Sequence, residues 1–251
     1  MADPVAWAAG LGLLGAILGS FVATLVVRWP QGRSVLRGRS ACDGCGRTLG
    51  GLELVPIVSF ALQRGRCRSC GAAIDPRHPT VELLALGIGA ASGWAAPGLE
   101  GVAGAVFGWL LLALGGLDLA ALWLPDRLTA ILAAAGLAAG LLGVEPLLAD
   151  RLIGSVAGFG SLWLVGWSFH RLRGRQGLGG GDPKLFGAIG LWLGWRLLPA
   201  VLLIACLVGL GVAAWRLLLG RRVAGSDAMP LGTLLALAAY PAWLAMILMS
   251  G

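Results

Sequence analysis

Long apolar segments run through most of this chain and limit what it can fold into. We read eight of them, at residues 5–28, 80–97, 100–119, 125–143, 150–170, 183–195, 197–219 and 229–249. Most approach the roughly 20 residues that an α-helix needs to cross a bilayer, whereas 183–195 is short for a crossing. Because the bilayer offers no water to backbone polar groups, such spans fold as helices. The sequence predicts an all-α, polytopic membrane protein with about eight transmembrane helices.

The composition excludes an ordinary soluble domain. Only 12% of the residues are charged, against about a quarter in soluble domains, and the mean hydropathy is +0.86. A net charge of +7 can indicate nucleic-acid binding, but only if the basic residues gather on one surface. Here their placement follows membrane topology instead. We therefore expect a lipid bilayer as partner and no nucleic acid. The sequence does not indicate an oligomeric state.

The Lys and Arg residues orient the chain. Nine lie between the first two spans and eight lie in later loops on the same side, which leaves only Arg151 and Arg196 opposite. Positively charged loops stay in the cytoplasm. Both termini are therefore predicted to be periplasmic, with Asp118, Asp126 and Asp182 at the cytoplasmic ends of helices.

This pattern divides the chain into three parts. Residues 1–28 form the first transmembrane helix, residues 29–79 a cytoplasmic segment, and residues 80–251 the remaining membrane domain. The cytoplasmic segment is basic and has few apolar residues. A piece of about 50 residues with so small a core needs a further source of stability.

Two C-x-x-C motifs, separated by 21 residues, supply a candidate for that stability: Cys42 with Cys45, and Cys67 with Cys70. Four cysteines presented by two tight turns fit a structural zinc site of the zinc-ribbon kind. Two disulfides are the alternative, but they would require the opposite topology, since the cytoplasm is reducing. Zinc binding would supply folding energy that the small core lacks.

Asp118 and Asp182 are the candidate catalytic residues. Each also has a purely structural explanation: Asp182 can be a helix cap ahead of Pro183, and Asp118 can be an interfacial residue just outside the membrane. A carboxylate at the membrane edge is costly, however, unless it faces water or a partner. Two acids that face one cavity share a proton, so one acts as base and the other as acid. Such a pair can activate water and protonate a leaving amine, as peptide hydrolysis requires.

The loop from Gly179 to Gly181 precedes Asp182 directly. Three successive glycines are a poor start for a helix because they cost backbone entropy. They do let an extended substrate backbone approach closely and pair with the loop. We therefore expect Gly179, Gly180 and Gly181 to form a substrate loop.

Taken in order, these motifs resemble those of the type IV prepilin peptidases, bacterial members of the GxGD class of intramembrane aspartyl proteases. The resemblance covers nearly the whole chain. It is carried by Gly19-Ser20-Phe21, Arg28-Trp29-Pro30, both cysteine motifs, Arg64 to Arg68, Pro79-Thr80-Val81-Glu82-Leu83, Asp118 with Leu124-Pro125-Asp126, and Gly179 to Lys184.

The resemblance implies an enzyme that cleaves prepilins or pseudopilins at the cytoplasmic face of the inner membrane, with Asp118 and Asp182 as the catalytic pair. It also implies methylation of the new N-terminus by S-adenosylmethionine, a function assigned to residues 29–79, and places Lys184 in the substrate loop. Glu53 and Glu82 are the candidate methyl-transfer residues, although Glu82 could instead pair with an arginine.

The chain departs from the family at three places: Ala23 replaces an asparagine, Ala120 replaces a second aspartate, and the loop from Leu52 to Pro56 lacks an asparagine found in some members. A peptidase without methyltransferase activity is therefore an alternative. A transporter or proton relay also places acids in a membrane, but it would show internal repeats and acids near the bilayer midplane. A zinc-bearing adaptor would leave Asp118 and the glycines without a role.

Overall fold

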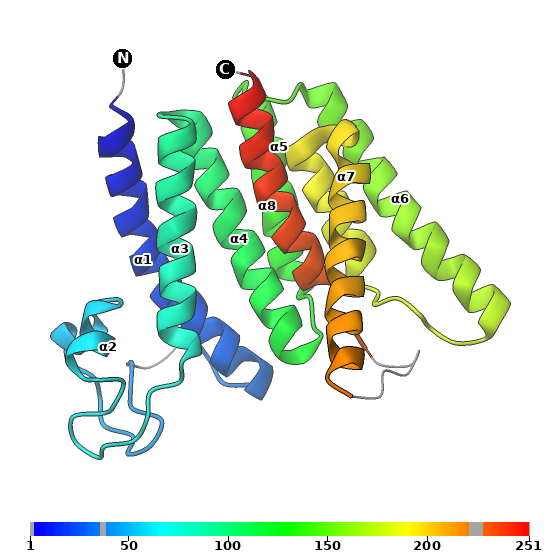
Figure 1. Ribbon diagram of the computed structural model, residues 1–251. Helices are drawn as coiled ribbons and strands as arrows, with labels where there is room; N and C mark the ends of the chain where they lie inside the picture. The colour runs from blue at the N-terminus through cyan, green and yellow to red at the C-terminus, as the bar shows by residue number, and fades with distance from the viewer. Residues whose placement is uncertain (1–2, 36–38, 221–227, 251) are drawn as a thin grey trace. The chain divides into compact units, whose positions relative to one another are not determined.

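The computed structural model describes residues 3–35, 39–220 and 228–250, and helices account for nearly all of their regular structure (Figure 1). In this part of the chain, strand-like pairing is confined to two isolated bridges, Ala41 with Thr48 and Arg66 with Ala73. The all-α prediction is confirmed. The helices are α1 (Pro4–Arg28), η1 (Trp29–Gln31), η2 (Gly51–Leu54), α2 (Val58–Leu62), α3 (Arg77–Ala95), α4 (Leu99–Ala121), α5 (Asp126–Leu141), α6 (Leu148–Arg173), α7 (Asp182–Leu218) and α8 (Leu231–Ser250).

Five helices among the described residues have the length and hydropathy of a membrane crossing. They are α1 together with η1, and α4, α6, α7 and α8. The protein is thus a multi-pass membrane protein by helix content, while the count of eight spans stays a prediction. The short helix α2 was not predicted.

Helix α7 covers 37 residues and contains a kink, in the region where the sequence predicts two spans. At 1.5 Å per residue, a straight helix of this length would measure about 55 Å, well beyond the roughly 30 Å of a bilayer core. Gly194 interrupts it with φ 69 and ψ 178. The yellow and orange portions in Figure 1 meet there at a turn, so the break lies two residues before the predicted boundary.

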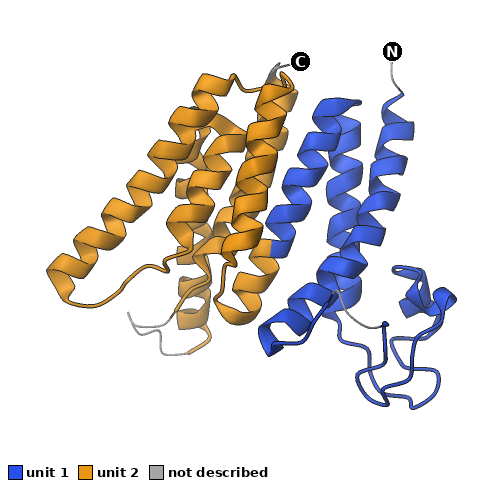
Figure 2. Ribbon diagram, turned by 180° about the vertical axis from the view of Figure 1, so that it is seen from behind, with its two compact units in different colours: residues 1–113 blue, residues 114–251 orange. Residues whose placement is uncertain are grey.

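The chain divides into two compact units, residues 1–113 and residues 114–251 (Figure 2). In the first unit α1 packs closely on α3 through glycines. Gly15 lies against the Ala85 backbone, and a Cβ on Gly19 would come within 2.8 Å of the Ala85 side chain. The Trp109 indole of α4 donates to the Ala85 carbonyl at 2.8 Å. These small residues let the two helices approach closely, as is common in helical membrane proteins.

In the second unit a buried arginine joins three helices. Arg151, in the first turn of α6, is 0% exposed. Its guanidinium pairs with no carboxylate among the described residues and donates instead to five backbone carbonyls, those of Gly136, Val144, Glu145, Pro146 and Leu191. The sequence analysis assigned Arg151 only a topological role. The structure adds that it ties the end of α5 and the first half of α7 to α6.

Candidate functional site

The second unit buries both candidate catalytic aspartates. Asp118 lies one turn before the end of α4 and is 5% exposed, and Asp182 is the first residue of α7 and is 7% exposed. Few charged side chains of the described residues are buried this deeply. An ionisable group is rarely left inside a helical membrane unit without a functional reason.

The start of α8 holds the Asp118 carboxylate. The Thr233 backbone N–H donates to Asp118 Oδ2 at 2.8 Å, and the Thr233 hydroxyl lies 3.3 Å from the same oxygen. That hydroxyl also donates to the Gly115 carbonyl of α4 at 2.8 Å. The first N–H groups of a helix have no partner inside the helix, so they are free to bind an anion. Helix α8 therefore fixes one catalytic candidate in place.

Thr233 is a site residue that the sequence analysis missed. The available signal was Pro230, which directly precedes the first residue of α8 and marks a helix start. Helix starts of this kind are common, however, and nothing in the local sequence indicates which anion the helix faces.

The Asp182 carboxylate turns back towards the glycine loop. Its Oδ2 accepts the Gly179 N–H at 3.1 Å, and its own N–H donates to the Gly179 carbonyl at 3.2 Å. Gly181 occupies the N-cap position, so Asp182 begins the helix without being the cap that its sequence position suggests. Its carboxylate is therefore available to face Asp118.

The two aspartates meet at one place in the fold. The Gly232 backbone N–H acts on both carboxylates, and the charge of Asp118 acts on Asp182. A Cβ on Gly232 would lie 3.0 Å from Asp118 Oδ2, so the backbone of α8 closely approaches the pair. Residues that lie 64 positions apart in sequence thus form one polar site inside the second unit.

The three glycines of the loop have different surroundings. A Cβ on Gly179 would come within 2.8 Å of Asp182 Oδ2, and one on Gly181 within 2.8 Å of Leu124 Cβ. A Cβ on Gly180 would meet nothing within 4 Å. Gly179 and Gly181 therefore allow the close packing of Asp182 against the α4–α5 connection. A pairing of this loop with substrate backbone stays a prediction.

Lys184 forms an ion pair within the same unit. Its Nζ lies 2.7 Å from Asp126 Oδ1, and both side chains are largely exposed. Asp126 is the first residue of α5, directly after Pro125, as expected. The pair links the first turn of α7 to the first turn of α5, on either side of the buried aspartates.

The four candidate metal ligands lie together in the first unit. The Sγ atoms of Cys42, Cys45, Cys67 and Cys70 are all within 4.8 Å of one another, and those of Cys42 and Cys70 are 3.8 Å apart. A tetrahedral zinc ion with Zn–S bonds of about 2.3 Å requires S···S separations of about 3.8 Å. The donor set and its spacing therefore fit a zinc ion, and the cluster can bind a metal.

The two cysteine motifs adopt the same turn. In each, the first cysteine donates its N–H to the carbonyl five residues on, and the glycine after the second cysteine donates to the first cysteine's carbonyl. Those glycines, Gly46 and Gly71, both have φ +70. The backbone N–H groups of Cys70 and Ser69 lower the pKa of the Cys67 thiol to about 6, which favours the thiolate that metals bind.

Glu53 and Glu82, the candidate methyl-transfer residues, line a cavity of about 150 Å³ in the first unit. The Arg47 guanidinium, 2.6 Å from Glu53 Oε1, holds the pKa of that carboxyl below its usual range. Glu82 is 6% exposed and accepts the Ile57 N–H at 2.7 Å. Among the described residues no arginine pairs with it, and its part in methyl transfer stays a prediction.

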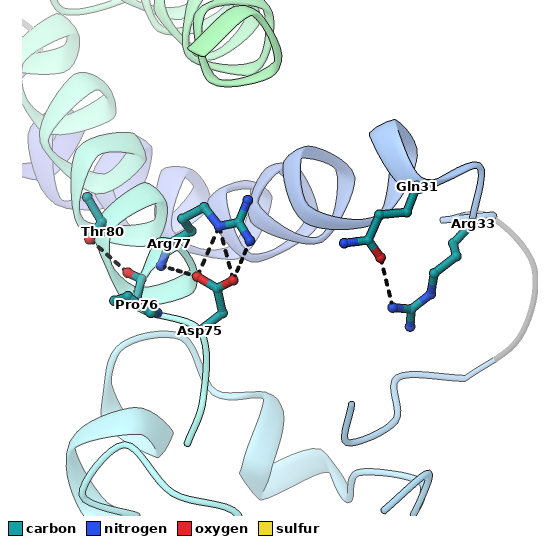
Figure 3. A network of polar contacts seen from close by, with 6 residues as sticks. All are labelled: Gln31, Arg33, Asp75, Pro76, Arg77 and Thr80. Atoms are coloured by element: carbon teal, nitrogen blue, oxygen red, sulfur yellow. Dashed lines mark hydrogen bonds and ion pairs between the residues drawn. The ribbon is translucent and has the colours of Figure 1, made fainter. Parts of the chain in front are cut away.

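Asp75, His78 and Glu82, at or just before the start of α3, line part of this cavity, and Figure 3 shows the polar contacts of the first turn of that helix. Asp75 and Arg77 make a two-pronged ion pair with an N···O distance of 2.5 Å, which lowers the pKa of the Asp75 carboxyl. The Thr80 hydroxyl donates to the Pro76 carbonyl at 2.8 Å. These local bonds fix the first turn of the helix on which Glu82 is carried.

The fold and the two sites define a class: a multi-pass helical membrane protein with a buried aspartate pair in one unit and a four-cysteine cluster in the other. Two family models match it. The Bacterial Peptidase A24 N-terminal domain covers residues 13–96, and the Type IV leader peptidase family covers residues 105–214.

Curated relatives point the same way, and each bears the name prepilin leader peptidase/N-methyltransferase. The protein of Aeromonas hydrophila is 41% identical over 210 residues, which cover 83% of this chain and 71% of the relative. The protein of Burkholderia pseudomallei is 43% identical, over 79% of this chain and 64% of the relative. The protein of Klebsiella pneumoniae is 37% identical, over 80% of this chain and 92% of the relative. No solved structure matches. The chain belongs to the type IV leader peptidase family.

Proposed function

We propose that this protein is a membrane endopeptidase that removes the leader peptides of prepilins or pseudopilins, with Asp118 and Asp182 as its catalytic pair. The observation that carries the proposal is that two buried carboxylates lie beside the same side chain, Leu124: Gly232, which contacts Asp118, and Gly181, which precedes Asp182, both pack closely against it. Relatives named prepilin leader peptidase supply the substrate class.

The mechanism follows from how two neighbouring carboxylates share one proton. The ionised member takes a proton from a water molecule, whose oxygen then attacks the scissile carbonyl. The protonated member gives its proton to the leaving amine as the C–N bond breaks. The Thr233 N–H, together with the nearby Thr233 hydroxyl, favours an ionised Asp118 over an ionised Asp182, which accepts the Gly179 N–H.

The glycine loop and Lys184 serve this reaction in the proposal. Gly179 to Gly181 present backbone groups to an extended segment of substrate beside Asp182. Lys184 is engaged by Asp126, so its role is to hold the starts of α5 and α7 together around the site. A substrate helix must unwind before cleavage, and an irregular loop next to the acids offers its backbone new partners.

The first unit supplies the second half of the proposed activity. Residues 29–79 form a cytoplasmic segment held by a structural zinc ion on its four cysteines, and the methyl donor S-adenosylmethionine is used beside Glu53 and Glu82. The donor supplies an electrophilic methyl group for the new N-terminal amine of the pilin. The cavity that both glutamates line supports this placement, as does the methyltransferase half of the relatives' names.

The proposed location is the bacterial inner membrane, with the aspartate pair and the zinc segment on the cytoplasmic side and both termini in the periplasm. The distribution of Lys and Arg supports this orientation. Three of those residues, Arg37, Arg221 and Arg222, lie outside the described residues. The remaining membrane domain, residues 80–251, then carries the peptidase chemistry.

The test is cleavage of a prepilin by the purified full chain in detergent. Asp118→Asn and Asp182→Asn should each lower the rate by at least about a thousandfold, because an amide can neither accept nor donate the shared proton. Glu100→Gln, in the same helix as Asp118 but in its first turn, is the matched control and should cleave normally. Substantial cleavage by either aspartate variant would refute the pair. If no labelled methyl group passes from S-adenosylmethionine to the cleaved pilin, the protein is a peptidase without methyltransferase activity.

A further inference from the structure

The cavity of the first unit is lined by four carboxylates, three of which are neutralised by arginines. Asp43 lies 2.9 Å from Arg33, Glu53 lies 2.6 Å from Arg47, and Asp75 lies 2.5 Å from Arg77. These pairs are formed by residues close in sequence, and they stabilise the cysteine motifs and loops around the cavity. The fourth carboxylate, Glu82, differs from them.

Glu82 is a buried carboxylate without a cationic partner among the described residues. Its Oε2 accepts the Ile57 N–H at 2.7 Å, and nothing in the described chain donates to its Oε1. With 6% of the residue exposed, its charge is poorly solvated by bulk water. A buried charge is costly unless it is paired, so this side chain is suited to a cation that arrives with a ligand.

His78, one turn before Glu82, does not supply that charge. Burial lowers the pKa of its imidazole, and the nearby charges of Glu82, Asp75 and Asp43 oppose this lowering while that of Arg28 adds to it. Because burial is the largest of these effects, His78 is neutral near pH 7. His78 therefore supplies no positive charge to Glu82 near neutral pH.

Arg28, at the end of α1, lines the same cavity and provides the opposite charge. Its guanidinium donates to the Ala41 carbonyl at 3.3 Å and lies 3.9 Å from Asp43, which is itself paired more closely with Arg33. Arg28 is thus only loosely engaged, and its side chain is 18% exposed. Arg28 and Glu82 both line this cavity, which therefore presents a guanidinium and a carboxylate to one bound molecule.

An adjacent carboxylate and guanidinium match a zwitterion. We propose that this cavity binds the amino-acid end of the methyl donor, with Glu82 accepting its ammonium group and Arg28 its carboxylate. The assignment rests on the proposed methyltransferase function.

The methyl donor carries two positive charges, an ammonium and a sulfonium. The ammonium is the better partner for Glu82, because methyl transfer removes the charge of the sulfonium. An anion beside that sulfonium would stabilise the reactant more than the transition state.

The experiment measures binding directly, by calorimetry on the full chain in detergent. S-adenosylmethionine is compared with S-adenosylhomocysteine, which keeps the amino-acid end and lacks the sulfonium charge. Glu82→Gln removes the charge and keeps an oxygen for the Ile57 N–H, so the local fold is preserved. We expect it to weaken both ligands equally, by at least about tenfold, as for a lost charge-assisted hydrogen bond. Arg28→Met should weaken both as well.

Glu100→Gln is the matched control, since Glu100 lies in the same unit and does not line the cavity. It should bind both ligands within about twofold of the unaltered protein. Metal content and unfolding midpoint show that each variant is folded. Equal binding by the unaltered protein and Glu82→Gln overturns the site, and weakening of S-adenosylmethionine alone overturns the ammonium assignment. An unaltered protein that cleaves prepilin but binds neither ligand instead refutes the methyltransferase proposal on which the site depends.

Discussion

Two of the three glycines before Asp182 leave no room for a side chain. Gly181→Ala would push a methyl group into Leu124 at the α4–α5 connection and displace Asp182 from Asp118. We expect at least a tenfold loss of prepilin cleavage, because small displacements of a catalytic group are costly. Gly180→Ala, one residue away and facing open space, should cleave within about twofold of the unaltered protein. Equal rates for both variants would remove the packing argument.

Arg151 makes the densest set of bonds of any side chain described. Arg151→Met would leave its buried carbonyl acceptors without a donor, and each such group costs about 1–3 kcal/mol. We expect a clear fall in the unfolding midpoint in detergent. Arg196→Met is the control, since Arg196 is 73% exposed and lies 3.9 Å from Asp150. A loose surface pair of this kind contributes little, so this variant should unfold almost normally.

The residues of the aspartate site could be predicted unequally. Asp118 and Asp182 were recognisable because a carboxylate at a helix end in an apolar chain is rare. Thr233 was not, because it holds the Asp118 carboxylate through its own backbone N–H, a group that almost every residue carries. Arg151 was not either, because it binds backbone carbonyls of other elements, which are alike in every sequence. The role of Glu82 was half visible, because neither its burial nor its bond from the Ile57 N–H could be read from its neighbours in the chain.

Helix α7 shows how one glycine can redirect an element. Gly194 has φ 69 and ψ 178, a backbone region that glycine alone occupies readily. Gly194→Ala should therefore destabilise the protein by about 1–3 kcal/mol, measured by denaturant unfolding in detergent. Gly211→Ala, in the second half of the same helix with nothing within 4 Å, should be neutral or slightly stabilising. Similar losses in both variants would show that the turn at Gly194 carries no strain.

Most of the helices lie where the apolar segments predicted them. The segments at 100–119 and 150–170 appear as α4 and α6 with one to three more residues at either end. Helix ends are set by capping and local hydrogen bonds, which the apolar pattern reports only approximately. The small helices around the cysteines were not predictable in this way, because residues 29–79 contain no apolar period that could indicate them.

The two units separate the proposed chemistry, with the four cysteines in the first and both aspartates in the second. Removing zinc with a chelator, or replacing Cys42 by serine, should unfold the cysteine segment and abolish methyl transfer. Prepilin cleavage should persist at a third or more of its rate, since no cysteine lies in the unit that holds Asp118 and Asp182 apart from Cys206. Metal analysis should give one zinc per chain. Active methyltransferase with far less metal would exclude the structural zinc ion.

The orientation of the whole chain depends on where its basic residues lie. Of the 19 Lys and Arg residues, only Arg151 and Arg196 fall on the side assigned to the periplasm, and Arg151 is buried among backbone carbonyls. A buried charge of this kind adds no positive charge to a periplasmic loop, so the asymmetry between the two sides is even stronger than the sequence count suggests.

Alkaline phosphatase, which is active only in the periplasm, should thus be active when fused after Gly251 and inactive when fused after Arg175, in the α6–α7 connection. A green fluorescent reporter at the same two positions should give the opposite result. Phosphatase activity at Arg175 would place the aspartate pair on the periplasmic side, where uncleaved leader peptides are not presented.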